Sequence, residues 1–211
     1  MSPRAEQKQQ TRQALMDAAR ALMDSNRGFD SLSLREVSRA AGIVPTGFYR
    51  HFEDMDQLGL ALVAEVDATF RSTLREVRRS QFEMGSIIEA SARIFLDTVS
   101  ANRNQFLFLA REQYGGSQSV RKAIGQLRQQ ITDDLVADLK LLSRTPHLDA
   151  ADLDIVSDLV VKTVFATLPE LIDPPATSLP PHLTPEAKMV QQLRFIFIGA
   201  KHWQGLGSRT A

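Results

Sequence analysis

The stretch that decides the fold runs from Ser33 to Phe52 and reads SLREVSRAAGIVPTGFYRHF. Ser33 suits the N-cap of a helix, and Glu36 follows three residues later, where its carboxylate can reach back to the Ser33 amide. Gly42 suits the end of that helix, because glycine accepts a positive φ without strain. Pro45 suits the first turn of a second helix, where its missing N–H has no partner. The pattern therefore predicts two short helices joined by a tight turn.

The second of these helices has one apolar face and one polar face. Phe48 and Phe52 are four residues apart, so both point to the same, buried side. Five outward residues combine a hydroxyl, a glycine, a phenol, a guanidinium and an imidazole: Thr46, Gly47, Tyr49, Arg50 and His51. Such a helix can enter the major groove of DNA and contact bases and phosphates. We expect these five residues to contact DNA, and Ser33 and Arg35 to touch phosphate; the alternative is an ordinary helical hairpin with a solvated face.

The same residues carry a resemblance. The run SLREVSRAAGIVPTGFYRHFEDMDQL resembles the helix-turn-helix signature of the TetR family of bacterial transcriptional repressors. The variant PTGFYRHF, with LGL at residues 58–60, is most similar to the FabR and DesT type, which controls unsaturated fatty acid synthesis. The strong match covers roughly residues 4–62, and a shorter echo is NRNQF at 102–106, continuing to Arg111 and Glu112.

The resemblance implies a fold, an assembly and an effector. We expect an all-α protein with a three-helix, helix-turn-helix DNA-binding domain over residues 1–54 and a larger helical ligand-binding and dimerisation domain over 55–211. The implied function is repression of genes of lipid metabolism by a homodimer on a palindromic operator. The implied effector is long-chain acyl-CoA, with unsaturated chains strengthening DNA binding and saturated chains weakening it. The sequence itself does not fix that sign.

Composition agrees with a cytoplasmic, globular protein. The chain has 211 residues, 43% of them hydrophobic, and a formal net charge of zero. Residues 1–52 nevertheless hold eight Lys or Arg against five Asp or Glu, a modest local excess that suits a DNA-binding module. The absence of cysteine excludes disulfides and thiolate metal sites and fits a reducing compartment. No apolar run is long enough to span a membrane, so we expect no membrane insertion.

The remaining chain reads as helices. Residues 1–10 are polar, and we expect them to be partly ordered, either as an arm whose Arg4 and Lys8 reach DNA or as a solvated tail. A first helix is expected from about Thr11, and a long helix capped by Asp54 from about 55 to 79. Further helices are expected at about 86–101, 103–114, 119–142, 150–172 and 185–203.

Apolar residues of the middle helices are the candidates for an effector site. Core packing explains most of them without a ligand, but they offer few polar groups to recognise a polar drug, which favours a lipid chain. Arg111 and the adjacent Glu112 are expected either to pair with one another or to contact a headgroup. The candidate pocket residues are Leu62, Val66, Phe70, Ile88, Phe95, Phe106, Leu109, Arg111, Tyr114, Leu135 and Phe165.

The last two expected helices supply the apolar surface for a dimer. The final helix is apolar on nearly every side at residues 195–198, which predicts that this part is buried. We expect the two helices of each chain to form a four-helix bundle with a second copy. The residues expected in it are Val160, Val161, Val164, Phe165, Val190, Leu193, Ile196, Phe197 and Ala200.

Catalysis and metal binding have weaker support. The four histidines lie far apart in the sequence without ligand spacing, and no glycine-rich phosphate loop is present. Ser119 and Lys122 match the four-residue pattern of serine acylases, but the companion motifs are absent. We therefore expect no enzyme, no metal and no cofactor. The alternative function within the same family is repression of an efflux pump in response to a hydrophobic drug, because one scaffold serves both.

Overall fold

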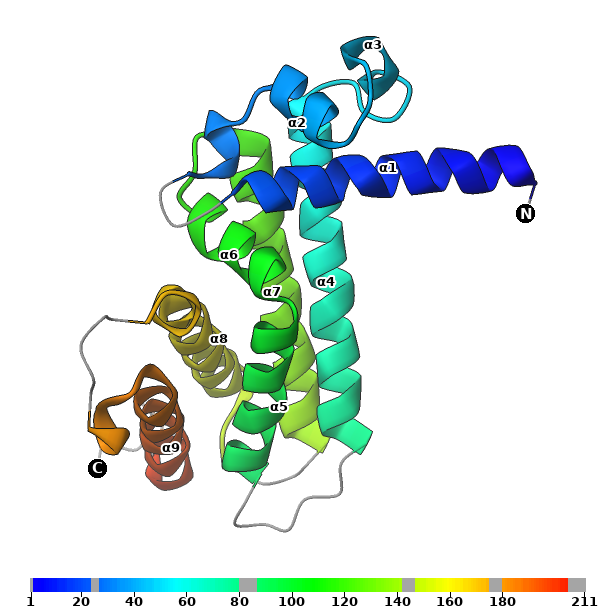
Figure 1. The fold of residues 1–211 in the computed structure, drawn as a ribbon. Helices are drawn as coiled ribbons and strands as arrows, with labels where there is room; N and C mark the ends of the chain where they lie inside the picture. The colour runs from blue at the N-terminus through cyan, green and yellow to red at the C-terminus, as the bar shows by residue number, and fades with distance from the viewer. Residues whose placement is uncertain (1, 24–26, 80–86, 142–146, 175–179, 205–211) are drawn as a thin grey trace. The chain divides into compact units, whose positions relative to one another are not determined.

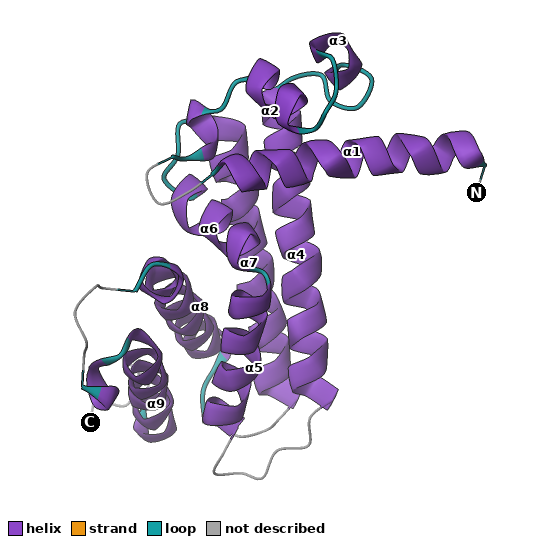
Figure 2. Ribbon diagram, in the orientation of Figure 1, coloured by secondary structure: helices purple, strands orange, loops and turns teal. Residues whose placement is uncertain are grey.

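The computed structural model describes residues 2–23, 27–79, 87–141, 147–174 and 180–204. These residues form helices joined by short loops (Figure 2). The α-helices are α1 (Pro3–Leu22), α2 (Leu34–Ala40), α3 (Pro45–Phe48), α4 (Met55–Arg79), α5 (Ile87–Ala101), α6 (Arg103–Glu112), α7 (Gln118–Leu141), α8 (Ala150–Ile172) and α9 (Pro185–His202), with short 3₁₀ helices η1 (Phe29–Ser31) and η2 (Pro181–Leu183) (Figure 1). The all-α expectation is confirmed.

The chain divides into two compact units. The first comprises residues 1–74 and 99–125, and the second comprises residues 75–98 and 126–211. Helices α4, α5 and α7 each contribute residues to both units. None of the helices in the described part of the chain combines the length and hydrophobicity that crossing a bilayer requires.

In the first unit, α1 packs against α2 and α6 through its C-terminal half. Leu15, Met16, Ala18 and Ala19 are buried there. Glu65 of α4 forms an ion pair with Arg20 and accepts a hydrogen bond from Gln13 at 2.8 Å, so α1 is also fixed to α4 by polar contacts. The C-terminal half of α1 is therefore held by apolar packing, and by an ion pair and a hydrogen bond to α4.

The N-terminal expectation was wrong in one respect. Helix α1 begins at Pro3 and not near Thr11, with Ser2 as its N-cap. The Ser2 hydroxyl accepts a hydrogen bond from the Ala5 N–H at 3.4 Å, and Pro3 has no N–H that a helix would leave unpaired. Polarity alone suggested a tail, whereas these start signals and the packed half of the helix begin it at Pro3.

In the second unit, α8 and α9 lie side by side (Figure 1). Met189 and Leu193 of α9 form an apolar cluster with Ala92 of α5, and Val160 and Val164 of α8 pack against it. A second cluster joins Leu139, Leu148, Leu153, Val156 and Ala200. The other helix boundaries agree with the expected ones within a few residues; Ser86, Leu142 and the break expected near Gly85 fall outside the described residues.

Candidate functional site

A capping box fixes the start of α2. The Ser33 side chain accepts the Glu36 N–H, and the Ser33 N–H donates back to the Glu36 carboxylate at 3.0 Å. Arg27 donates to the same carboxylate at 2.8 Å. The Arg27 bond, followed by the bonds from Ser33, lowers the pKa of Glu36 to about 2. The capping box that the spacing predicted is thus present, and its contacts favour the charged carboxylate.

The turn between α2 and α3 depends on two glycines. Gly42 has a φ of 70°, the left-handed region that side chains avoid, and confirms the predicted end of α2. The next residue, Ile43, donates its N–H to the Ser38 carbonyl at 2.8 Å. A Cβ at Gly47 would lie 2.7 Å from Cγ2 of Ile43, so a side chain at 47 would require Ile43 or the backbone of the turn to shift. Gly47 therefore has a structural role in addition to the DNA contact expected of it.

Two buried phenylalanines orient the outward face of the α3 segment. Phe48 and Phe52 are 0% and 2% exposed, and their ring centroids lie 5.6 Å apart. With these rings held inside, Thr46, Tyr49 and Arg50 are exposed. The structure thus brings together the side chains that the sequence assigned to DNA, on one short segment of residues 46–51.

Arg35 and Ser33, the two residues at the start of α2 that we expect to contact phosphate, differ in whether their donors are already used. Arg35 is exposed. Ser33, in contrast, uses both of its donors within the capping box, because its hydroxyl and its N–H both bond to Glu36 Oε2. Ser33 would have to release one of these bonds to reach a phosphate.

Val44 is a residue that the sequence reasoning missed. It is the N-cap position of α3, and its side chain is 67% exposed beside Thr46. An exposed apolar group next to a DNA-reading helix can contact the methyl group of thymine. The available signal was an apolar residue at an N-cap position, where polar residues are usual.

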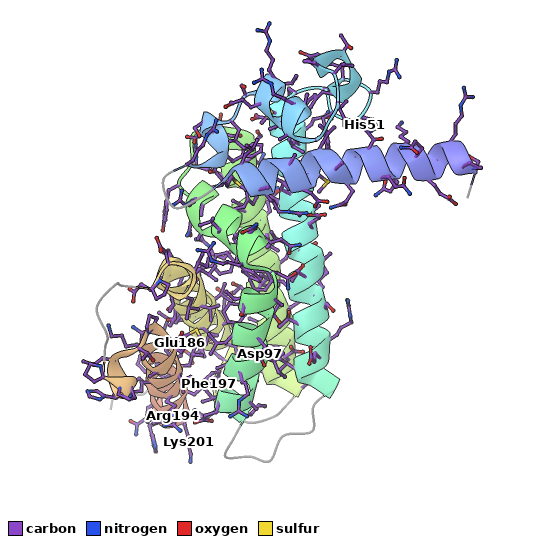
Figure 3. The ribbon with its side chains drawn as sticks, viewed as in Figure 1. His51, Asp97, Glu186, Arg194, Phe197 and Lys201 are labelled. Carbon is purple, nitrogen blue, oxygen red and sulfur yellow. The ribbon has the colours of Figure 1, made fainter. Side chains whose placement is uncertain are left out.

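His51 lies on the segment that follows α3 (Figure 3). Its Nδ1 is buried without a hydrogen-bond partner among the described residues. Burial of the imidazole is the largest cause that lowers the pKa of His51. The charges of Lys8, Arg12 and Arg50 lower it further. In the free protein this ring is therefore biased toward its neutral form, although the neighbouring cations would attract an anion.

The candidate pocket residues of the first unit are mostly buried. Leu62 and Val66 of α4 are each 1% exposed. Phe70 of α4 and Phe106 of α6 form an edge-to-face ring pair with centroids 5.3 Å apart. Leu109 is fully buried, and Arg111 is partly buried. The Phe70–Phe106 pair joins α4 to α6, and an effector site at these residues stays a prediction.

Tyr114 and Glu112 depart from the expectation. Tyr114 is 84% exposed in the turn after α6, so it is not part of the buried apolar group. Glu112 is 2% exposed and accepts a hydrogen bond from the Phe29 backbone N–H at 2.8 Å. Glu112 therefore bonds to the backbone of Phe29. The charge of Arg111 is the smallest of the four causes that act on the pKa of Glu112. Helix-end signals indicated that this stretch was near a boundary, but no local pattern indicated a partner 83 residues away.

The other four candidates lie in the second unit. Phe165 is buried, whereas Ile88, Phe95 and Leu135 are partly buried. Ile88 and Phe95 pack against the cluster around Met189, and Leu135 packs against the cluster around Leu139. Ile88, Phe95 and Leu135 thus contribute to the core of the second unit, and Phe165 is buried in it.

The apolar surface of α8 and α9 is distributed differently from the prediction. Val161, Phe165, Leu193 and Ala200 are buried within the chain. Val160, Val164, Val190, Ile196 and Phe197 are partly buried. The residues left exposed are instead Ile155 (56%) and Leu159 (46%) on α8 and Phe195 (75%) and Ile198 (58%) on α9. Phe195 and Ile198 are thus exposed in the single chain, and their burial by a second copy stays a prediction.

Ser119 lies in a structural network. Its hydroxyl donates to Asp56 at the start of α4 and lies 3.0 Å from the Ser117 hydroxyl. This arrangement joins the beginnings of α4 and α7. Within the described residues, no three His, Asp or Glu side chains are placed to hold a metal ion.

Family models match both parts of the chain. Residues 15–62 match the model for bacterial regulatory proteins of the tetR family. Residues 84–199 match the model for the tetracyclin repressor-like C-terminal domain.

Solved structures share the fold at low sequence identity. The fatty acid degradation regulator FadR from Bacillus halodurans has a TM-score of 0.70 at 11% identity, covering 96% of this chain and 99% of that one. FadR from Thermus thermophilus, solved with lauroyl-CoA, has a TM-score of 0.59 at 16% identity, covering 95% and 98%. NalD, the secondary repressor of the MexAB-OprM multidrug efflux pump in Pseudomonas aeruginosa, has a TM-score of 0.57 at 17% identity, covering 92% and 100%. At these identities the likeness shows the fold alone.

Proposed function

Because the chain belongs to the TetR family of bacterial transcriptional regulators, which bind DNA operators and small-molecule effectors, we propose that it represses genes of lipid metabolism in response to long-chain acyl-CoA. The genes proposed are those of unsaturated fatty acid synthesis or desaturation. The subgroup resemblance of residues 45–52, 58–60 and 102–106 supports this choice over other effectors of the family.

The DNA-reading part of the proposal rests on one observation. Phe48 and Phe52 are buried, and this orientation leaves Thr46, Tyr49 and Arg50 exposed on the adjoining face. In this proposal Tyr49 and Thr46 read base edges, and Arg50, His51 and Arg35 pair with phosphates. Tyr49→Ala is expected to cost about 1–3 kcal/mol of operator binding if the phenol reads a base.

We propose that the regulator acts as a homodimer through α8 and α9. One short reader helix contacts too few bases for useful specificity, so two must reach successive major grooves about 34–36 Å apart. Phe195 and Ile198 of α9 and Ile155 and Leu159 of α8 are large apolar side chains exposed in the single chain. A second copy would remove them from water. The operator should accordingly be a palindrome.

The effector proposal follows from the apolar chemistry of α4 and α6. Leu62, Val66 and Phe70 of α4, and Phe106 and Leu109 of α6, are buried carbon-rich side chains. A close-packed apolar site distinguishes a straight saturated chain from a chain bent by a cis double bond, because equal volumes of different shape do not fill it equally. We propose that the bent chain strengthens DNA binding and the straight chain weakens it.

Helix α4 is the proposed route from effector to DNA. It begins three residues after Phe52, and Glu65 in its middle is bonded to Gln13 and Arg20 of α1. A displacement of α4 near Glu65 would therefore displace α1, which packs against α2. A ligand can shift this equilibrium only through different affinities for the two arrangements.

Three measurements test the proposal. Selection of duplexes from a random library should yield a palindrome bound by the wild type and bound far more weakly by the Tyr49→Ala, Arg50→Ala double variant. Arg93→Ala, which removes an exposed guanidinium from α5, is the matched control. Operator binding by the double variant that equals the wild type would refute the assignment of the reader.

Titration of that complex with oleoyl-CoA, palmitoyl-CoA and free coenzyme A tests the effector. The two thioesters should change the operator dissociation constant in opposite directions, and free coenzyme A should have little effect. Identical effects of the two thioesters would refute discrimination of chain shape. No effect of either would favour the second candidate, an efflux-pump repressor that responds to a hydrophobic drug. Mass spectrometry of lipid that copurifies with the protein would identify a bound chain directly.

A further inference from the structure

The first two turns of α1 form an exposed helical extension of the first unit. Residues 2–10 are exposed, and burial begins only at Leu15. A helix that is polar all round gains little from apolar burial, so its start signals and the packed part of the helix hold it in shape. Figure 1 shows this end of α1 projecting beyond the other helices of its unit.

One face of this extension is basic. Arg4, Lys8 and Arg12 follow one another at intervals of four residues, which places them on the same side of the helix. Glu6 is two residues from Arg4 and Lys8, so it lies on nearly the opposite side. Like charges at this spacing repel one another and destabilise an isolated helix. A nearby anion would remove that penalty.

The basic face meets the end of the DNA-reading segment. The guanidinium of Arg12 lies 4.6 Å from the centroid of the Phe52 ring. Lys8, Arg12 and Arg50 are all close enough to His51 to lower its pKa, after the larger effect of burial. These are the charged groups that bear on the imidazole from α1 and from its own segment.

No ion pair among the described residues balances the charges of this cluster. Across the described ranges of the chain, the structure gives no ion pair to Lys8, Arg12 or Arg50. The Arg12 side chain donates instead to the sulfur of Met16 at 3.2 Å. Four nitrogen-bearing side chains from two segments thus converge without a counter-ion, beside the face that carries Tyr49 and Arg50.

We propose that Lys8, Arg12, Arg50 and His51 form a phosphate-binding cluster that extends the DNA contact from the α3 segment onto the projecting end of α1. The occupant is a phosphate of the operator backbone, and Arg4 lies one turn further along the same face to reach the next one. The proposal rests on operator binding through α2 and α3. It adds contacts that are independent of base sequence and therefore strengthen binding to operator and to non-specific duplex alike.

The test measures the salt dependence of DNA binding for the full-length protein. Lys8→Gln removes one exposed charge, and Lys140→Gln on α7 makes the same change elsewhere. Lys8→Gln should reduce the slope of log affinity against log salt by about 0.9 for each phosphate that is no longer neutralised, and by about twice that in a dimer. The Arg4→Gln, Lys8→Gln double variant should reduce it further, and Lys140→Gln should not change it.

The melting temperature of the free protein separates the proposed DNA contact from a structural role of Lys8. If Lys8 only contacts DNA, removing one of three like charges should leave the melting temperature unchanged or slightly higher. If Lys8 holds the fold together, Lys8→Gln should lower it. A slope equal to the wild-type slope in the double variant, with operator binding retained, would overturn the cluster while leaving the proposed function intact. Weaker binding of free coenzyme A by Lys8→Gln, with an unchanged DNA slope, would overturn it by assigning the cluster to the effector. Failure of the wild type to select any operator would instead count against the proposed function.

Discussion

The side-chain carboxylate of Glu112, the last residue of α6, accepts a hydrogen bond from the backbone N–H of Phe29 at 2.8 Å. This bond ties the end of α6 to η1, which leads into the helix-turn-helix. The Phe29 ring packs edge-to-face on Phe108 of α6 with centroids 5.6 Å apart. The second oxygen, Oε2, is buried without a partner among the described residues, and a Cβ at Gly115 would lie 2.1 Å from it.

Replacing Glu112 by alanine should therefore lower the stability of the protein more than replacing it by glutamine. Glu112→Ala leaves the buried Phe29 N–H without an acceptor, which is expected to lower the free energy of unfolding by about 1–3 kcal/mol. Glu112→Gln keeps an acceptor oxygen of the same reach and should be milder. Chemical denaturation of the two variants and the wild type measures the difference. Equal losses in both would show that the bond to Phe29 contributes nothing.

The pH dependence of the same residue has a defined sign. Burial raises the pKa of Glu112, the Phe29 bond opposes this, and the charge of Asp30 adds to the rise. The folded state therefore holds the proton more tightly than the unfolded state does. This stabilisation is complete below the ordinary carboxyl pKa and is lost as the pH rises through the raised value. The wild type should lose stability relative to Glu112→Gln over that window, and parallel pH profiles would contradict the shift.

Gly59 and Gly125, which both lie inside helices, should respond in opposite ways to substitution by alanine. A Cβ at Gly59 of α4 would lie 2.6 Å from Val120 Cγ2 and 2.9 Å from the Phe29 ring, whereas a Cβ at Gly125 of α7 meets nothing within 4 Å. Gly125→Ala should stabilise the protein by about 0.5–1 kcal/mol, because alanine has less chain entropy to lose. Gly59→Ala should destabilise it by about 1–3 kcal/mol through overpacking. The melting temperatures of the two variants should move in opposite directions.

Local patterns predicted most of the helix-turn-helix. The cap at Ser33, the end of α2 at Gly42, and the buried pair Phe48 and Phe52 all depend on neighbours a few residues away, so sequence spacing contains the needed information. Thr46, Tyr49 and Arg50 follow from the same helical period. The long helices could likewise be placed from periodicity.

Contacts distant in the sequence could not be predicted. Nothing near Glu112 indicates a bond to Phe29, and nothing near Gly59 indicates that Val120 lies against it. The faces of α8 and α9 were also ambiguous, because both helices carry apolar residues on more than one side. Sequence could not decide that Leu193 is buried within the chain while Phe195 is exposed.

That exposed surface gives a test of the proposed dimer. Phe195→Glu places a charge where we propose that a second copy packs, at an expected cost on the order of 2–4 kcal/mol. The dimer dissociation constant should rise by about thirtyfold or more. Leu141→Glu is the control, because Leu141 is another large apolar side chain, 82% exposed, at the end of α7 and outside α8 and α9. Sedimentation analysis that shows the same oligomeric state for both variants would contradict an interface at Phe195.

The last prediction concerns His51 and the pH dependence of DNA binding. In the free protein its pKa is lowered by burial and by nearby cations, so the fold favours the neutral ring. The resulting stability is present above about pH 6.5, the ordinary pKa of imidazole, and is lost as the pH falls through the lowered value. A phosphate in the proposed cluster would have the opposite effect, because an anion favours the charged ring. DNA binding should then take up a proton, and operator affinity should rise as the pH falls from about 8 toward 6.

Two histidine variants test this prediction. His51→Gln cannot take up that proton, so its affinity should depend less on pH. His182→Gln, at an exposed histidine of η2, should behave like the wild type. Equal pH dependence in all three proteins would show that His51 does not meet a phosphate.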